Sequence, residues 1–379
     1  MATVTVIGAG PVGLQTAIGV KNHGFDVEVL EEHKEVGMPV ACTGIMQKKS
    51  CEELKLDLSE CMVNEFRGAK IFSPGKHLLE VKREMAVANM VNRHAFDKTF
   101  LKKAQKLGIP VETETKLIDI RKNSLFLEAK GRGGLKKTSI IVGADGPHSV
   151  ARNIVEPTNN SNFIHAIQVA AKGSFDREMA EVHFGKFAPK FFAWVAPESN
   201  STARVGLGAP LGSNLKKLLD DFAAERGIDL RDCNDKMSGL IPVGAPMDSV
   251  VKGNILLVGD AGHITKATTG GGLVLGLKAA NACSEAIVQH LKNKRPLAEY
   301  NSKLKPITRD LMLHWKIYSH IHSLSYQDMD KLFLKAKKSG IEEFLNRHGD
   351  MDHPSRFVGK IMTTPRLWGM MGEAIKVLF

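Results

Sequence analysis

The sequence predicts an α/β fold in which a lobe built on a parallel sheet joins an antiparallel sheet and a C-terminal helical region. Three observations predict it. A strand, a glycine-rich turn, a helix and a second strand follow one another within residues 3–31. Residues 163–210 alternate between apolar and polar side chains, as antiparallel strands do. From about residue 297 to the end, the periodicity is helical almost throughout.

Composition excludes several classes of protein. The 379 residues carry a net charge of +11, which suggests anionic partners, but the basic residues are scattered without interleaved aromatics, so we expect no nucleic acid. The 5 cysteines form no CxxC pair, which argues against a disulfide scaffold or zinc site and favours a reducing compartment. We see no signal peptide and no apolar run that could span a bilayer, so any membrane contact is expected to be peripheral.

The first stretch carries a dinucleotide fingerprint of the Rossmann type. Gly8 ends the first strand with a tight turn, Gly10 lets a pyrophosphate approach the backbone, and Gly13 lets helix and strand pack closely. The helix N-terminus offers free N–H groups to phosphates. Glu31 closes the second strand, where a carboxylate can accept hydrogen bonds from a ribose diol. We therefore expect a bound dinucleotide.

The remaining elements follow from periodicity and turn residues. Up to residue 107 we expect a loop over 32–44, an exposed helix over 46–60, short strands over 62–91 and a helix from Arg93 to Leu107. Strands follow at 111–120 and 124–129, then a polar turn over 131–137 and a buried strand over 138–146. Further along the chain we expect a helix over 213–227, a strand over 253–260 and a helix from Leu273 to Lys292. These divide the chain into a cofactor lobe at 1–160 with inserted strands at 62–91, a substrate lobe at 161–250, a second part of the cofactor lobe at 251–296, and a helical region at 297–379.

Two further strand ends resemble the other signatures of the FAD-dependent hydroxylase and reductase superfamily. One strand ends in Asp145-Gly146, and another ends in Gly259-Asp260 ahead of a triple glycine. The resemblance implies that the cofactor is FAD, that Asp260 meets its ribitol chain and that the Asp145 loop lies close to the dinucleotide. It also implies cofactor contacts at Gly271, Gly272 and Leu273.

Within that superfamily, the chain resembles the geranylgeranyl reductases, in particular the archaeal digeranylgeranylglycerophospholipid reductases. The stretches that carry the likeness are Pro39-Val40-Ala41-Cys42-Thr43-Gly44, Arg93-His94-Ala95-Phe96-Asp97, Pro189 to Pro197 and Arg204 to Gly208. The likeness implies that Cys42, Thr43, Gly44 and Arg93 support FAD. Phe192 and Ala196 depart from the family's tyrosine and phenylalanine, and the proline usual before the triple glycine is missing.

The resemblance implies reduction of isoprenoid double bonds in a geranylgeranylated membrane lipid. Phe192 and Trp194 share one face of a strand and could line a tunnel for the prenyl chain, although ordinary sheet core explains them nearly as well. Cys42 is either a flavin-proximal residue that influences proton delivery or a small buried apolar residue. A flavin monooxygenase acting on an aromatic substrate and a non-catalytic flavin- or lipid-binding protein remain alternatives.

The expected partners are the lipid, an anionic membrane surface and an external electron donor, which the sequence leaves open among ferredoxin, a deazaflavin and NAD(P)H. The expected location is the cytoplasm, peripheral to the inner membrane face. The aromatic and methionine residues of the tail favour helix–helix core or membrane contact: Trp315, Tyr318, Trp368, Met370, Met371 and Phe379. The cluster of His348, Asp350, Asp352 and His353 holds potential metal ligands, but its spacing favours a solvated loop, so we expect no metal.

Overall fold

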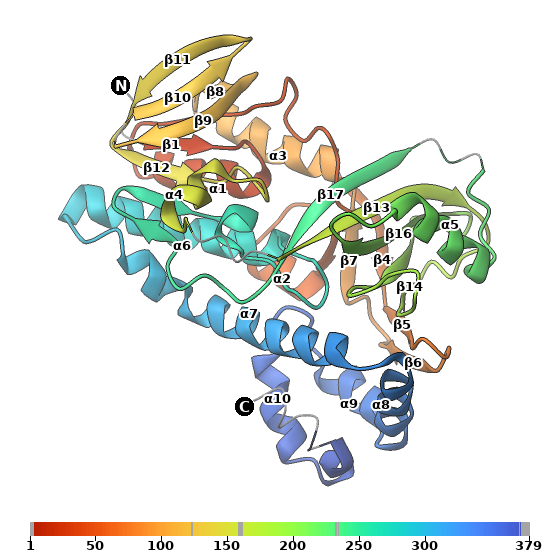
Figure 1. Ribbon diagram of the computed structural model, residues 1–379. Coiled ribbons are helices and arrows are strands. Elements are labelled where there is room, and N and C mark those ends of the chain that lie inside the picture. Colours follow the sequence, from red (N-terminus) through yellow and green to blue (C-terminus); the bar gives the residue numbers. More distant parts are fainter. Residues whose placement is uncertain are drawn as a thin grey trace.

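A computed structural model of the chain describes residues 4–122, 124–157, 162–231, 233, 235–370 and 372. Two sheets organise it, one largely parallel and one largely antiparallel, and C-terminal helices pack below them (Figure 1). The predicted fold class is confirmed. Met371 and Phe379 lie outside the described residues, as do the side chains of Trp368 and Met370 and the predicted lobe boundary at 160–161.

The six-stranded sheet has the order β18-β19-β12-β1-β2-β8. Its strands are β1 (Val4–Ile7), β2 (Val27–Leu30), β8 (Val111–Glu112), β12 (Ile140–Gly143), β18 (Val251–Lys252) and β19 (Ile255–Leu257). All neighbours are parallel except β18 and β19. The central strands β1 and β12 are fully buried, so their apolar runs need no alternation. Helices α1 (Pro11–Lys21) and α4 (Val150–Val155) contact these strands, and α3 (Arg93–Lys106) and α6 (Leu273–Asn293) pack on α1.

The seven-stranded sheet has the order β17-β13-β16-β15-β14-β5-β6. Its strands are β5 (Gly68–Phe72), β6 (Leu78–Lys82), β13 (Asn162–Lys172), β14 (Met179–His183), β15 (Ala193–Pro197), β16 (Thr202–Pro210) and β17 (Lys236–Val243). One face packs on α5 (Leu215–Arg226), whose Phe222 is almost fully buried. Strands β5 and β6 therefore belong to this sheet although β6 ends at Lys82, far before β13 begins at Asn162.

Two small antiparallel sheets complete the strands. One is β11-β10-β9, formed by β9 (Thr115–Arg121), β10 (Ser124–Ala129) and β11 (Arg132–Lys137). The other is β3-β7-β4, formed by β3 (Ile45–Gln47), β4 (Met62–Phe66) and β7 (Ala88–Val91). The short α2 (Lys48–Glu53) follows β3.

The C-terminal region is helical, as predicted. It contains α7 (Glu299–Ser323), α8 (Tyr326–Lys338), α9 (Ile341–His348), α10 (Ser355–Met362) and the 3₁₀ turn η2 (Pro365–Met370). Helix α7 runs from α6 toward β6, with α8, α9 and α10 below it (Figure 1). It reaches both large sheets, because the Tyr300 hydroxyl donates to the Leu257 carbonyl of β19 and Tyr318 packs in one cluster with Val243 of β17. No helix among the described residues is long and apolar enough to cross a membrane.

Four predictions of local structure were wrong. The exposed helix over 46–60 is only the six residues of α2, because β3 takes the start of that stretch. The polar turn over 131–137 is β11, which pairs along its whole length with β10. The strand over 111–120 is two strands of different sheets. The cluster around Asp352 is not a solvated loop, because Asp352 is 0% exposed.

Candidate functional site

The glycine turn after β1 has no room for side chains where it packs and open space where a ligand would approach. Gly8 has φ +103°, and a Cβ there would lie 2.2 Å from the Ala144 carbonyl oxygen. A Cβ on Gly13 would lie 2.1 Å from the Gly8 carbonyl oxygen. At Gly10, by contrast, a Cβ would meet nothing within 4 Å in the described part of the chain. Gly10 also begins α1 without a side-chain cap from the described residues, which leaves N–H groups for an anion.

Glu31 is fastened to this turn. One oxygen of its carboxylate accepts a hydrogen bond from the Ala9 N–H at 2.8 Å, and the other accepts from the His33 N–H at 2.9 Å. The side chain therefore lies against the glycine turn, at the carboxyl end of β2. Its predicted role toward a ribose stays a prediction.

The carboxylate of Asp145 serves helix α4. It accepts hydrogen bonds from the Ser149 hydroxyl at 2.6 Å and from the N–H groups of Val150 and Ala151 at 2.8 and 3.3 Å. Burial raises the pKa of this carboxyl, while those hydrogen bonds act in the opposite direction. Because the side chain is occupied in this way, the backbone of the Asp145 loop is the part that can face a dinucleotide.

Asp260 lies in a 3₁₀ turn after β19 and faces the start of α6. Its Oδ1 atom accepts a hydrogen bond from the Thr265 hydroxyl at 3.0 Å, and a Cβ on Gly272 would lie 3.0 Å from the same atom. Burial raises the pKa of the carboxyl, against the pull of Thr265 and Arg93. Gly272 begins α6 with no side-chain cap from the described residues, so this second helix start also offers free N–H groups.

The fold brings the three signatures to one edge of the parallel sheet. The signatures follow β1, β12 and β19, and these strands with β2 are parallel neighbours, so their carboxyl ends meet there (Figure 1). A Cβ on Gly259 would lie 3.3 Å from the Val12 side chain, and one on Gly276 would lie 2.8 Å from it. The starts of α1 and α6 therefore abut. Two uncapped helix starts beside open space at Gly10 fit an extended, phosphate-bearing cofactor.

The Cys42 turn lies beside Arg93. Cys42 is exposed, and its Sγ atom accepts from the Gly44 N–H at 3.4 Å. Arg93 is bonded to both oxygens of Asp97 at 3.0 and 3.2 Å. Burial alone would lower the pKa of the Arg93 guanidinium, but Asp97 and the Cys42 side chain hold it above its usual range. A Cβ on Gly44 would lie 3.4 Å from the Arg93 side chain, so Cys42, Gly44 and Arg93 lie close together. That they support FAD stays a prediction.

Gln168 is the site residue that sequence reasoning missed. It lies on β13, only 3% exposed, and its Oε1 atom accepts from the Thr43 hydroxyl at 2.7 Å and the Trp194 ring N–H at 3.3 Å. It thus joins the Cys42 turn to the predicted substrate residue Trp194. The sequence did offer a signal, because a glutamine among the apolar residues of a strand needs a hydrogen-bond partner when it is buried.

Phe192 and Trp194 belong to an aromatic cluster between the seven-stranded sheet and α7. Phe191 stacks on Phe192 at 4.2 Å between ring centroids, and Phe192 meets Trp194 edge-on at 6.0 Å. Trp315 and Tyr318 of α7 contribute a second stacked pair at 5.5 Å. The same cluster includes Ala267, in the loop between Asp260 and the triple glycine, so apolar side chains lie next to the Gly259-Asp260 signature. A substrate role for Phe192 and Trp194 stays a prediction.

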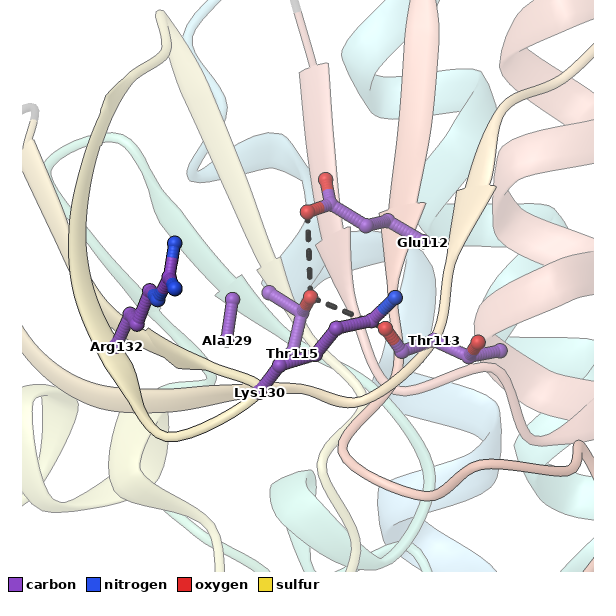
Figure 2. A pocket seen from close by; sticks show the side chains of 6 residues that line it. All are labelled: Glu112, Thr113, Thr115, Ala129, Lys130 and Arg132. Carbon is purple, nitrogen blue, oxygen red and sulfur yellow. Dashed lines mark hydrogen bonds between the residues drawn. The ribbon is translucent and has the colours of Figure 1, made fainter.

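A polar pocket opens beside Glu31. Figure 2 shows its lining, in which the Thr115 hydroxyl donates to Glu112 at 3.2 Å. The lining residues are Glu112, Thr113, Thr115, Ala129, Lys130 and Arg132. Backbone hydrogen bonds from Glu31 to Glu112 and from Thr115 to Glu31, both 2.8 Å, make the pocket a neighbour of the first signature. Among the described residues, no group of three His, Cys, Asp or Glu side chains could hold a metal ion.

Comparisons with known proteins identify a family for the chain. The sequence model of the family described as FAD binding domain matches residues 1–226, and that of the lycopene cyclase proteins matches residues 210–372. The chain is 28% identical to an uncharacterized protein of Methanocaldococcus jannaschii, over 95% of this chain and 94% of that one. It is 29% identical to a digeranylgeranylglycerophospholipid reductase of the same organism, over 87% and 89%.

Among solved structures, a geranylgeranyl bacteriochlorophyll reductase-like protein from Thermoplasma acidophilum has the same fold. The TM-score is 0.83 at 20% identity, and the alignment covers 98% of this chain and 99% of that one.

Proposed function

The chain belongs to the FAD binding domain family, and on that premise we propose that it reduces isoprenoid double bonds in a geranylgeranylated lipid. The predicted cofactor, FAD, is confirmed by the family, whose model matches residues 1–226. The lipid substrate is the part that we propose. It is supported by similarity to relatives named digeranylgeranylglycerophospholipid reductases, which are 26–29% identical to this chain.

The residues that would hold FAD fall into two groups. Gly8, Gly10 and Gly13, with Glu31, form one anchor at the start of α1. Asp260, Gly271, Gly272 and Leu273 form the second at the start of α6. FAD, once reduced, supplies a hydride for the alkene carbon. The chain contributes orientation, exclusion of water and a place for the proton.

One observation carries the proposal: polar contacts connect the exposed Cys42 turn to a buried apolar surface. Gln168 accepts from both Thr43 and Trp194, so the turn next to Arg93 and the aromatic cluster are held as one unit. The partly buried rings of the cluster, Trp194 and Trp315, favour a hydrocarbon chain as neighbour, because removing apolar surface from water is favourable at about 25 cal/mol per Å². A small polar aromatic substrate would gain less there.

Cys42 is the residue we propose for proton handling. Its thiol is exposed next to the Arg93 guanidinium, within the turn that the resemblance assigns to FAD. The net charge of +11 also supports contact with an anionic membrane face, where such lipids lie. Flotation with anionic vesicles would test that contact, and absence of binding would contradict it.

The deciding experiment is anaerobic. The purified holoprotein would be reduced with dithionite and mixed with a geranylgeranylated glycerophospholipid, and in parallel with the same lipid bearing saturated chains. We expect flavin reoxidation by the unsaturated lipid alone, with a mass gain of two hydrogens per reduced bond. If the lipid does not reoxidise the flavin, but oxygen admitted afterwards does so with hydroxylation of an added aromatic compound, the protein is a monooxygenase. A reduced flavin that reacts with neither would identify a binding protein.

A further inference from the structure

Lys266 is built into the loop that the sequence predicts to contact FAD. Its N–H donates to the Gly271 carbonyl at 3.1 Å, and its carbonyl accepts from the Thr269 and Gly270 N–H groups at 3.2 and 2.8 Å. The side chain turns under the same loop. A Cβ on Gly271 would lie 3.1 Å from Cε and 3.3 Å from Nζ of Lys266. The ammonium group therefore lies directly beside Gly271.

The partner of Lys266 comes from the far end of the chain. Asp352 lies between α9 and α10, and its Oδ1 atom is 2.5 Å from Nζ. The two side chains are 7% and 0% exposed, so the ion pair is almost completely removed from water. The second oxygen of Asp352 is buried without a hydrogen-bond partner among the described residues. Lys266 is the member of the pair that touches the glycine loop, and Asp352 lies behind it.

Fastening the C-terminal segment does not by itself account for this pair. The neighbouring His353 already binds Asp310 of α7 at 2.8 Å, and the Ser355 N–H donates to the same carboxylate at 3.1 Å. Burying two charges has a large desolvation penalty, and apolar residues of similar size often hold a structure as well. A buried cation next to a cofactor loop does have an electrostatic consequence, because the charge is poorly screened there.

We propose that Lys266, with Asp352 as its counterion, sets the reduction potential of the bound FAD. This inference rests on the FAD site described above. Two-electron reduction of the flavin by an external donor takes up two electrons and one proton, so the ring gains one negative charge. A cation at the loop stabilises that added charge and raises the potential, whereas the carboxylate behind it partly offsets the effect. The two members of one ion pair therefore act on the potential with opposite signs.

The test measures the midpoint potential of the holoprotein by anaerobic spectroelectrochemical titration. We expect Lys266→Met to shift the two-electron reduction equilibrium at least ten-fold toward oxidised flavin, which is about 30 mV. Asp352→Asn should shift it toward reduced flavin, by about three-fold or more. Asp310→Asn is the matched control, because it breaks the neighbouring pair with His353, which holds the same segment, and leaves the charges of Lys266 and Asp352 in place. It should leave the potential unchanged.

Each outcome decides the proposal. Opposite shifts in the two variants support it, whereas shifts of the same sign, or none, with FAD still bound would overturn it. If the single variants fail to fold, the Lys266→Met/Asp352→Leu double variant leaves no buried charge unpaired. Its potential should lie below that of the wild type, and an unchanged value would overturn the proposal. Lack of reaction with prenyl lipid together with opposite shifts would refute the proposed function alone.

Discussion

His314 provides the sharpest test of the electrostatics around the glycine loop. It lies on α7 with 4% of its surface exposed, and its Nδ1 atom shares a hydrogen bond with the Thr268 hydroxyl at 2.7 Å. Burial, reinforced by the Lys266 charge, lowers the pKa of His314 from 6.5 to about 4. At pH 5 the unfolded chain therefore binds a proton at this residue while the folded chain does not. The free energy of unfolding is therefore not reduced by His314 well above pH 6.5, and it is reduced progressively as the pH falls toward 4.

The size of this effect follows from the two pKa values. Between pH 7 and pH 5, His314 alone should lower the free energy of unfolding by about 2 kcal/mol. Burial raises the pKa of Asp97 and Asp260, which changes stability in the opposite direction. The test is therefore a comparison of variants. His314→Gln keeps a polar partner for Thr268 but does not titrate, so its stability should fall about 2 kcal/mol less over this pH range.

Urea unfolding followed by tryptophan fluorescence at both pH values would measure the difference. His23→Gln, which removes an exposed histidine after α1, is the matched control and should keep the pH dependence of the wild type. Equal pH dependence in His314→Gln and the wild type would refute the reasoning, because it would mean that His314 is not held neutral by its surroundings.

Three further predictions concern single residues. Gly10→Ala should change the free energy of unfolding by no more than about 1 kcal/mol, because a Cβ there meets nothing within 4 Å among the described residues. The same variant should bind FAD at least ten-fold more weakly in a fluorescence titration, and unchanged affinity would argue against a pyrophosphate at this turn. Asp145→Ala should destabilise the protein by about 2 kcal/mol in urea unfolding, because it removes three hydrogen bonds at the start of α4, and an unchanged midpoint would contradict that role. Cys42→Ser should slow single-turnover lipid reduction about 100-fold with FAD content unchanged, and an unaltered rate would exclude proton handling by the thiol.

The sequence predicted the elements whose structure is decided within a few residues. The turn from β1 into α1 depends on three glycines close together in the chain, and the start of α6 depends on Gly272, so both could be inferred from spacing. Local sequence patterns predicted the wrong structure where a pairing partner elsewhere in the sheet decided the conformation. Residues 132–137 look like a polar turn, yet they form β11 because β10 lies alongside to accept their hydrogen bonds.

Contacts between distant residues were decided by the tertiary structure. Thr43 and Gln168 are 125 positions apart, and Lys266 and Asp352 are 86 apart, so no periodicity in the chain relates them. Asp352 in particular reads as a solvated residue in a polar loop, and only the packing of the C-terminal helices buries it against Lys266. By itself, the sequence determined that the chain carries a dinucleotide fingerprint, because that motif is local. Which charges and aromatic rings surround it was settled by packing, since burial depends on residues that meet only when the chain has folded.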